Sequence, residues 1–518
     1  MKENPKKTLK KQKCLLYSLT VATVFLIGFY FRLRPALVRP IIFDEAFTIT
    51  YLIKFDKLQE MIFADASVPP LHYLLMKLMS YVSTNILWLR SPSIVFSMLG
   101  IWLSYKFARK FSKKVALLVT IMLSFSTLHT LFSWQAYVYS QLFFLGTATV
   151  YLFFHLLTDR NIKNENLKAF LLFISGVLAF LTHYGFIWSI AGLALILFHK
   201  IILAKFNYKK IKSQHQKLIL AGSGTFLFLI GYSPIIIYNF NKALENIGWF
   251  DQIDIYTLGQ SFGKLLGFYD QFSWNIFLTS NISKILFTII FFFLIIYAIK
   301  LKKEKINYLV IVSLANLLLP IICSVIIGET IHATRAIIVS SFTFTLLFAI
   351  CINEMIRHQW QDLFLVIFVI FYLYFFTITN RNPHAISQEF DLIKQYTNWF
   401  YKHPNRLSND VNILVYSKNH PMQKSSSWIN YFVLDYYWKG YDDRKPLPNY
   451  KKIKTDEDLK QKHFYLLTVS EFENEEEKDI ICPNSNTLQI SRFEKRAQQT
   501  SDLYYYDSLD VYIYECNP

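Results

Sequence analysis

Eleven long apolar blocks restrict the fold of this 518-residue chain more than any other feature of its sequence. A helix needs about 20 mostly apolar residues to cross the hydrocarbon core of a bilayer, and ordinary core helices need no such run. The sequence therefore predicts an all-α polytopic membrane protein, and it excludes a soluble enzyme, a disordered chain and a disulfide scaffold. The expected spans lie near residues 14–31, 91–107, 115–132, 138–157, 168–182, 185–199, 218–238, 283–299, 306–327, 336–352 and 363–379.

The composition agrees with this interpretation. Hydrophobic residues make up 53% of the chain and charged residues 17%, whereas soluble domains average roughly 45–50% and about 25%. The run Cys14–Phe31 follows a lysine-rich start but lacks a small-residue cleavage site, so we expect a retained first span and not a signal peptide.

Basic residues between the spans indicate how the chain is threaded. If residues 1–13 form a cytoplasmic tail, every strongly basic short loop falls on the inside, as the positive-inside rule requires. The short turns that would then lie outside, 133–137 and 182–184, carry no Lys or Arg. The net charge of +18 is spread over separate loops and not gathered on one face, so no nucleic-acid partner is expected. The basic inside loops lie near 106–114, 160–168, 200–217 and 300–305.

Three regions are expected outside the membrane: a large first loop at about 32–90, a loop at 239–283 and the tail 381–518. They follow or interrupt a transmembrane domain at 14–380. Within the first loop, Pro69–Val82 is too short to cross and is predicted to be an amphipathic helix on the outer surface.

The tail is predicted to form a small extracytoplasmic α/β domain. It contains β-like runs at 412–416, 464–469 and 511–514, separated by charged stretches. Cys482 and Cys516 would lie in an oxidising compartment, where they would either pair or remain free thiols.

Carboxylates in the first outer loop are the first candidates for chemistry. Asp44 and Glu45 follow the first span directly, and charges at an interface are costly unless solvated, paired or used. Neighbouring helical residues diverge by about 100°, so one carboxylate can act on a substrate while the other holds it in place. The alternative is a solvated helix start with Asp44 as its cap. Asp65 stands in a turn before Pro69-Pro70, which by itself predicts only a helix start.

Taken in order, these residues resemble those of a known family. The family comprises polytopic membrane glycosyltransferases of the GT-C superfamily, of the protein O-mannosyltransferase and lipid A aminoarabinose transferase type (glycosyltransferase family 39-like). The resemblance covers about residues 14–200 well and the later spans loosely. Its elements are Asp44-Glu45-Ala46, Asp65, Pro69-Pro70-Leu71, Arg90-Ser-Pro-Ser93 and the basic turn from Tyr105 to Lys110.

Two positions depart from the family pattern. Relatives often have His directly before Pro-Pro-Leu, where this chain has Val68, with His72 nearby. Relatives often carry Arg after the third span, where this chain has Tyr137. A cation that could meet a donor phosphate is absent at that position, and Arg335 is the preferred substitute.

The resemblance implies an inverting transfer of one sugar from a polyprenyl phosphate to an acceptor on the outer face. A hydroxyl is a poor nucleophile near neutral pH, so Asp44 would accept its proton and Glu45 would orient Asp44 or the acceptor. The leaving phosphate gains charge, which a nearby cation stabilises. The residues expected to bind substrate are Asp65, Arg90, Arg335, His332, His183 and Tyr137.

Some of these candidates also have simpler interpretations. Arg90 and Arg335 stand at span ends, where a cation commonly snorkels to the interface. His183 stands in a tight turn. No cofactor is firmly expected, since the sequence has no glycine-rich phosphate loop and no metal-ligand spacing. Asp44 and Glu45 suit a shared divalent metal ion, but a full set of ligands cannot be named.

Two other functional classes share the expected architecture. A polysaccharide polymerase or ligase would also use lipid-linked glycans, but such proteins usually carry functional arginines in later outer loops. A lipid or sugar transporter would show internal repeats and charges within its spans, and neither feature is evident.

The location follows from the same features. The sugar and the acceptor, whether lipid, protein or glycan, are not specified by the sequence. Abundant Lys, Asn, Ile and Phe suggest an AT-rich bacterial genome, and hence a plasma (inner) membrane as the bilayer that holds the chain.

Overall fold

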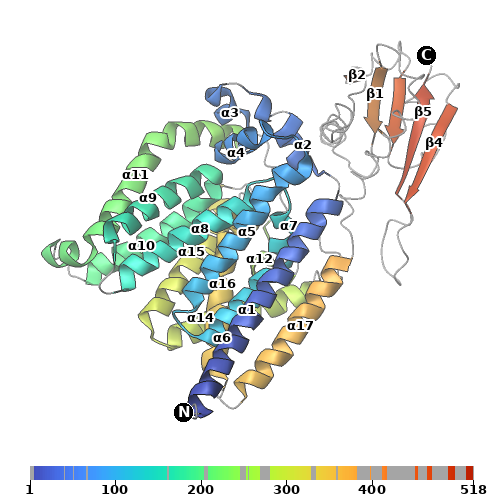
Figure 1. Ribbon diagram of the computed structural model, residues 1–518. Helices are drawn as coiled ribbons and strands as arrows, with labels where there is room; N and C mark the ends of the chain where they lie inside the picture. Colours follow the sequence, from blue (N-terminus) through green and yellow to red (C-terminus); the bar gives the residue numbers. More distant parts are fainter. Residues whose placement is uncertain are drawn as a thin grey trace. The chain divides into compact units, whose positions relative to one another are not determined.

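The computed structural model describes the membrane helices, short elements of the outer loops and five C-terminal strands (Figure 1). The chain divides into two compact units, each described by itself: Met1–Leu37, Asp56–Leu75 and Arg90–Asn382 form the first, and Val38–Phe55, Met76–Leu89 and Pro383–Pro518 the second. The described residues are 5–39, 41–50, 52–55, 57–65, 68–159, 163–203, 208–244, 253–254, 256–268, 280–327, 334–356, 360–381, 397, 411–416, 450–452, 464–468, 488–495 and 509–516.

Helices occupy every predicted span. Among the described residues, eight helices are long and apolar enough to cross a membrane, and α6 with α7, bent by 56° at their junction, would form a ninth. The apolar parts of the last two helices are shorter. A multi-pass helical membrane protein is therefore confirmed, and the number eleven stays a prediction. These helices are α1 (Pro5–Val38), α5 (Ile86–Ala108), α6 (Lys113–Ser124), α7 (Thr127–Ser133), α8 (Tyr139–Thr158), α9 (Glu165–Thr182), α10 (Ile187–Leu203), α11 (Tyr208–Leu244), α14 (Asn281–Lys300), α15 (Glu304–Ile327), α16 (Val339–Met355) and α17 (Gln361–Arg381).

Short elements lie between the long helices. The segment predicted as a surface helix contains α4, whose 10 residues are too few to cross a bilayer. The short elements are α2 (Phe43–Thr50), η1 (Leu52–Lys54), α3 (Leu58–Ala64), α4 (Leu71–Ser80), η2 (Tyr184–Phe186), α12 (Thr257–Leu265) and η3 (Thr334–Ile337).

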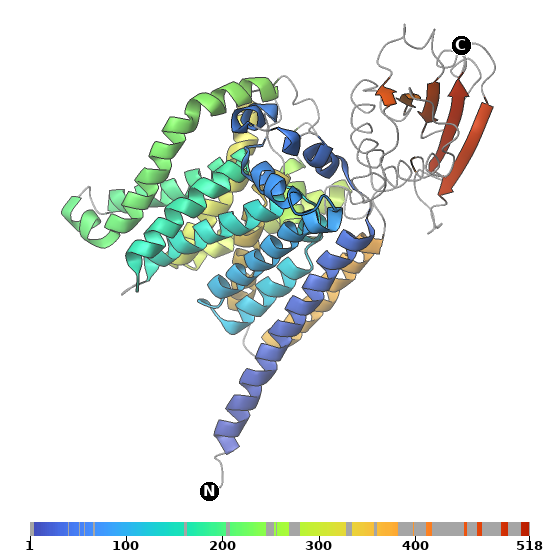
Figure 2. The same cartoon turned by 45° about the horizontal axis from the view of Figure 1, so that its top comes forward.

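Small and polar residues hold the membrane helices together, as expected where lipid tails compete with apolar side chains. A Cβ added to Gly146 would lie 2.3 Å from Val339 Cγ2, so α8 and α16 approach closely there. Buried hydroxyls also bond across helices, for example Ser313 to Thr343 at 2.8 Å. Figure 2 shows α1 (blue) beside α17 (orange). The rings of Phe31 on α1 and Phe376 on α17 meet edge to face, with their centroids 5.0 Å apart.

The third predicted span is broken, and α1 caps the break. The last carbonyl groups of a helix lack intrahelical partners, and in lipid each must find one. Arg32, expected at the start of the outer loop, instead lies within α1 and donates to the carbonyls of Leu123 at 3.0 Å and Ser124 at 2.9 Å. Tyr372 Oη donates to the carbonyl of Met122 at 2.9 Å. Side chains from α1 and α17 thus satisfy the end of α6.

The C-terminal strands form one five-stranded sheet in the order β2-β1-β3-β5-β4. β1 runs parallel to β2 and β3, and β5 runs antiparallel to β3 and β4. β1, β3 and β5 coincide with the three predicted runs. The α part of the predicted α/β domain and Cys482 lie outside the described residues. The strands are β1 (Val411–Tyr416), β2 (Tyr450–Lys452), β3 (Phe464–Thr468), β4 (Leu488–Lys495) and β5 (Leu509–Cys516).

Candidate functional site

Asp44 and Glu45 lie in the first turn of α2, in the second unit. The carbonyl of Ile42 accepts from Ala46 N–H at 2.9 Å, which makes Ile42 the cap of this helix. Glu45 is fully buried, and its Oε2 accepts from Ile42 N–H at 3.1 Å. This is the backward contact of a capping box, made without a polar side chain at the cap. Glu45 therefore fixes the start of the helix that carries Asp44, and Asp44 itself is partly exposed.

Asp65 lies in the first unit, at the end of α3, where the backbone becomes extended before α4. Tyr73 Oη, on α4, donates to Asp65 Oδ2 at 2.5 Å. The Tyr73 side chain is fully buried, and its burial together with the Asp65 charge raises the pKa of its phenol well above the usual value. Tyr73 therefore stays protonated and remains a donor to the carboxylate.

A second phenol lies within the electrostatic range of this carboxylate and is hydrogen-bonded to a membrane helix. The Asp65 charge also acts on Tyr184 of η2. Asn239, fully buried near the end of α11, donates from Nδ2 to Tyr184 Oη at 2.9 Å and to the carbonyl of Ile62 at 3.3 Å. Helix α11 thus contacts both α3, which ends at Asp65, and η2.

Tyr137 stands where the family pattern would place an arginine, and the structure turns it toward Tyr73. The two phenols are hydrogen-bonded, so a chain of groups runs from Tyr137 through Tyr73 to Asp65. His72 lies beside them, with Nδ1 3.1 Å from Gln141 Oε1. Desolvation of the buried ring lowers the pKa of His72 to about 4, so His72 is neutral near pH 7 and supplies no cation.

Arg90 is fully buried at the start of α5. Its Nη1 donates to the carbonyl of Ala36 at 2.9 Å, and its guanidinium lies 4.8 Å from the ring centroid of Trp134. These contacts join α5 to the end of α1 and to the turn after α7. A role of Arg90 in substrate binding stays a prediction.

The structure brings the turn of His183 together with the turn of Arg335. His183 caps η2, and its Nδ1 accepts from Gly185 N–H at 2.9 Å. A Cβ on Gly185 would lie 2.6 Å from the carbonyl oxygen of Ala336, so η2 and η3 are in close contact. Arg335 belongs to η3, but its side chain and the whole of His332 lie outside the described residues.

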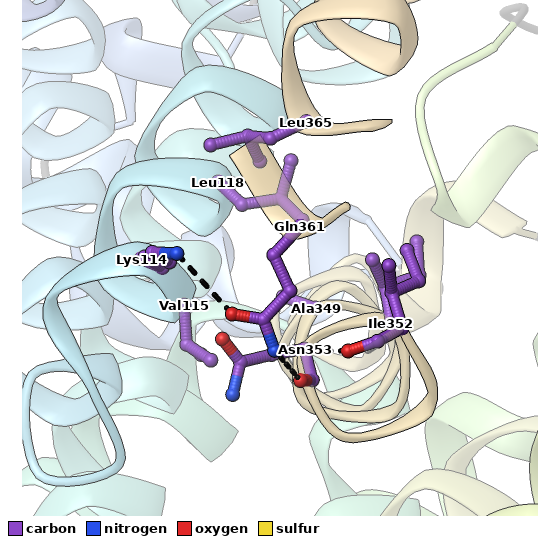
Figure 3. Close-up of a pocket in the computed structure, with 9 residues that line it drawn as sticks. Lys114, Val115, Leu118, Ala349, Ile352, Asn353, Gln361 and Leu365 are labelled. Carbon is purple, nitrogen blue, oxygen red and sulfur yellow. Dashed lines mark hydrogen bonds between the residues drawn. The ribbon is translucent and has the colours of Figure 1, made fainter. Parts of the chain in front are cut away.

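The described residues contain an open pocket of about 440 Å³ between α3 and α11, lined by Phe63, Pro234, Ile235 and Tyr238, and a much smaller one elsewhere. The described residues contain no group of three His, Cys, Asp or Glu side chains placed to hold a metal ion, and a divalent ion shared by Asp44 and Glu45 stays a prediction. The pocket in Figure 3 lies at the start of α6 and holds about 20 Å³, room for a single water molecule. There Gln361 Nε2 donates to the Asn353 carbonyl at 2.7 Å and Lys114 Nζ to Gln361 Oε1 at 3.2 Å. These hydrogen bonds connect the start of α6, the end of α16 and the start of α17.

Tyr73 and Asn239 are the residues that sequence reasoning missed. Nothing marks Tyr73, because its partner Asp65 is eight positions earlier across a Pro-Pro turn. Asn239 does carry a signal: it is a polar residue at the end of an apolar run, which in a membrane protein often marks a functional contact.

Comparison with known proteins shows a shared fold without a close sequence relative. No family model and no curated protein matches the chain. The structure of ArnT from Cupriavidus metallidurans in the apo state is similar to 98% of this chain over 98% of its own length, with a TM-score of 0.56 and 9% identity. The same protein bound to undecaprenyl phosphate aligns over 97% of this chain and 98% of its own length, with a TM-score of 0.51 and 10% identity. The chain therefore shares the fold of ArnT.

Proposed function

We propose that this protein transfers a sugar from a polyprenyl-phosphate-linked donor to an acceptor on the outer face of the membrane. The observation that carries the proposal is the fold shared over nearly the whole chain with ArnT, which has been solved bound to undecaprenyl phosphate. The carboxylates Asp44, Glu45 and Asp65, which follow one another in the first outer loop, also support it, because the acceptor hydroxyl needs a base. The sugar is already activated on the lipid, so no nucleotide-binding loop is needed.

In the proposed reaction the acceptor hydroxyl attacks the anomeric carbon from the face opposite the phosphate. A bond forms between acceptor oxygen and carbon, the bond from carbon to the phosphate oxygen breaks, and its electron pair leaves with the polyprenyl phosphate. The hydroxyl proton passes to Asp44, the proposed general base. Glu45 acts by fixing the start of α2, and Asp65 holds the acceptor or the sugar. Arg335 is the proposed cation for the leaving phosphate.

The contact between Tyr73 and Asp65 gives the first prediction. Tyr73→Phe removes only the hydroxyl that bonds Asp65 Oδ2. A hydrogen bond to a charged group contributes about 1.5–3 kcal/mol, so we expect kcat/KM to fall by about 10- to 100-fold. The loss should vanish in an Asp65→Asn background, because in a double-mutant cycle a residue that acts through another has no separate effect.

Tyr308→Phe is the matched control for this substitution. Tyr308 also donates to a carboxylate, Glu304 Oε1, at 2.7 Å, but at the predicted inside end of α15. Its loss should leave turnover unchanged. Equal losses in the two variants, or a full effect of Tyr73→Phe without Asp65, would contradict the assigned role of Tyr73.

Binding of the lipid carrier tests the proposed function without knowledge of the sugar. Undecaprenyl phosphate should raise the unfolding temperature of the purified protein by about 2–4 °C, whereas undecaprenol, which has the same tail and no phosphate, should not. Arg335→Gln should weaken this binding. Lys284→Gln is the control, because it removes a positive charge that is not assigned to the donor phosphate. Lys284, on α14, lies with its Nζ 5.6 Å from the centroid of the Tyr256 ring. Equal shifts with both lipids would mean that the protein recognises only the tail, contrary to the proposal.

A further inference from the structure

We propose that the predicted inside ends of α5, α8, α9 and α15 form a binding site for a phosphate group, supplied by an anionic phospholipid of the inner leaflet. The site is the cluster of Lys110, Lys168 and Lys305 around Asp159 and His155, called here the basic cluster. It lies at the ends of the helices opposite the Asp65 site and is independent of sugar transfer.

Two lysines converge directly on one carboxylate. Lys110 Nζ lies 2.6 Å from Asp159 Oδ2, and Lys305 Nζ lies 3.9 Å from Asp159 Oδ1. Asp159 is the residue at which α8 ends. Although partial burial opposes ionisation, hydrogen bonds from Lys110 and His155 hold the pKa of Asp159 below its usual value, so this carboxylate is charged near pH 7.

The third lysine reaches the carboxylate only through an uncharged ring. His155 Nδ1 contacts Asp159 Oδ2, and Lys168 Nζ lies 2.7 Å from His155 Nε2. An ammonium only donates, so Nε2 accepts from Lys168 and the imidazole is neutral. Its hydrogen is then on Nδ1 and is donated to Asp159, while Lys110 Nζ, 3.0 Å from Nδ1, donates to the same carboxylate oxygen. Lys168 thus donates to a neutral group, and its charge is not balanced by a carboxylate at this contact.

The basic cluster therefore carries three positive charges and one negative charge, a surplus of two. Other ion pairs at the same ends of the helices are one to one, such as Lys303 with Glu354 at 3.0 Å and Lys200 with Glu304. The positive-inside rule accounts for lysines in these loops but not for three gathered around one carboxylate and the histidine that contacts it. The side chains of Lys110 and Asp159 are only 24% and 25% exposed, so water screens the repulsion incompletely. An anion would balance the surplus.

The shape of the cluster favours the headgroup of a lipid. The ring of Tyr151 stacks on His155 with an interplanar angle of 10°, and Lys110 Nζ lies 5.3 Å from the Tyr151 centroid. An aromatic wall beneath a cation, at the end of a membrane span, suits a group that is polar at one end and apolar at the other. Lys305 is 45% exposed and is open to a ligand. Basic pockets between transmembrane helices on the cytoplasmic side commonly bind phosphate-bearing headgroups.

The test compares unfolding temperatures of the full chain in detergent with three additives: dioleoylphosphatidylglycerol, dioleoylphosphatidylcholine and inorganic phosphate at matched ionic strength. Lys168→Gln and Lys305→Gln each remove one charge from the basic cluster. Lys303→Gln removes the same charge from the adjacent one-to-one pair and is the control. Each protein is compared with its own unfolding temperature without additive, so that a loss of basal stability does not affect the result.

We expect phosphatidylglycerol to raise the unfolding temperature of the wild type and of Lys303→Gln by about 2–4 °C, and to raise that of the two cluster variants by less than half as much. Phosphatidylcholine should have little effect on any protein. A selective effect of inorganic phosphate alone would overturn the lipid as the source of the phosphate. The same shift in all four proteins, or no shift in the wild type, would overturn the site itself.

Discussion

Asp44→Asn is expected to abolish sugar transfer while the protein still folds and still binds undecaprenyl phosphate. The amide keeps the size of the side chain in the first turn of α2 but cannot accept the acceptor proton. General-base catalysis contributes about 10²- to 10⁴-fold, so kcat should fall by at least two orders of magnitude with little change in donor affinity. Single-turnover transfer and lipid binding, measured on the same preparation, separate the two quantities.

Asp362→Asn is the matched control for this substitution. Asp362 also stands in the first turn of a helix, α17, where its carboxylate pairs with Lys114 at 2.8 Å. If Asp44 only stabilised the start of α2, both substitutions would affect stability slightly and leave turnover intact. That result would contradict the role of Asp44 as base and would direct attention to Asp65.

Arg32→Met should produce the largest loss of stability. Arg32 is fully buried in α1 and donates to Ser97 Oγ and to the carbonyls of Gly28, Leu123 and Ser124, at 2.8 to 3.0 Å. Methionine fills a similar volume but leaves the carbonyls of Leu123 and Ser124 at the end of α6 without donors. A buried polar group without a partner costs about 1–3 kcal/mol, so two of them should cost about 2–6 kcal/mol.

Thermal unfolding in detergent measures this loss. Arg34→Met is the control on the same helix, because Arg34 is exposed and its substitution should change stability little. Arg32→Lys should recover only part of the loss, because one ammonium cannot reproduce the fork of a guanidinium. Equal unfolding temperatures for the two methionine variants would contradict the assignment of Arg32 as the cap of α6.

The positions of the membrane helices could be predicted from the sequence because lipid leaves few alternatives to a long apolar helix. The break between α6 and α7 could not. Its stability depends on partners far away in the chain: Arg32 on α1, Tyr372 on α17 and the carbonyl of Gly267, which accepts from Thr127 N–H at 3.2 Å. The spacing of apolar residues in the sequence does not indicate such capping contacts.

Only the charged residues of the candidate site could be proposed from the sequence. Asp44 stands out as a carboxylate directly after an apolar span and Asp65 only through the family resemblance, whereas Tyr73 gains its proposed role from its contact with Asp65. The spacing of Ile42 and Glu45 is that of a capping box, but isoleucine has no capping oxygen, so the contact of Glu45 was not recognisable. In the sequence, Tyr137 stands where the family pattern has an arginine that could meet the donor phosphate. The structure places Tyr137 in the chain of phenols that leads to Asp65.

Turnover of a lipid-linked donor tests the central claim most directly. The purified protein would be incubated with a panel of sugars carried on undecaprenyl phosphate and with membrane extract as the source of acceptors, and undecaprenyl phosphate would be quantified by mass spectrometry. We expect the wild type to release one undecaprenyl phosphate for each sugar transferred from at least one donor, and Asp44→Asn to release none above background. A wild-type protein that binds undecaprenyl phosphate but consumes no donor would contradict the assignment as a glycosyltransferase.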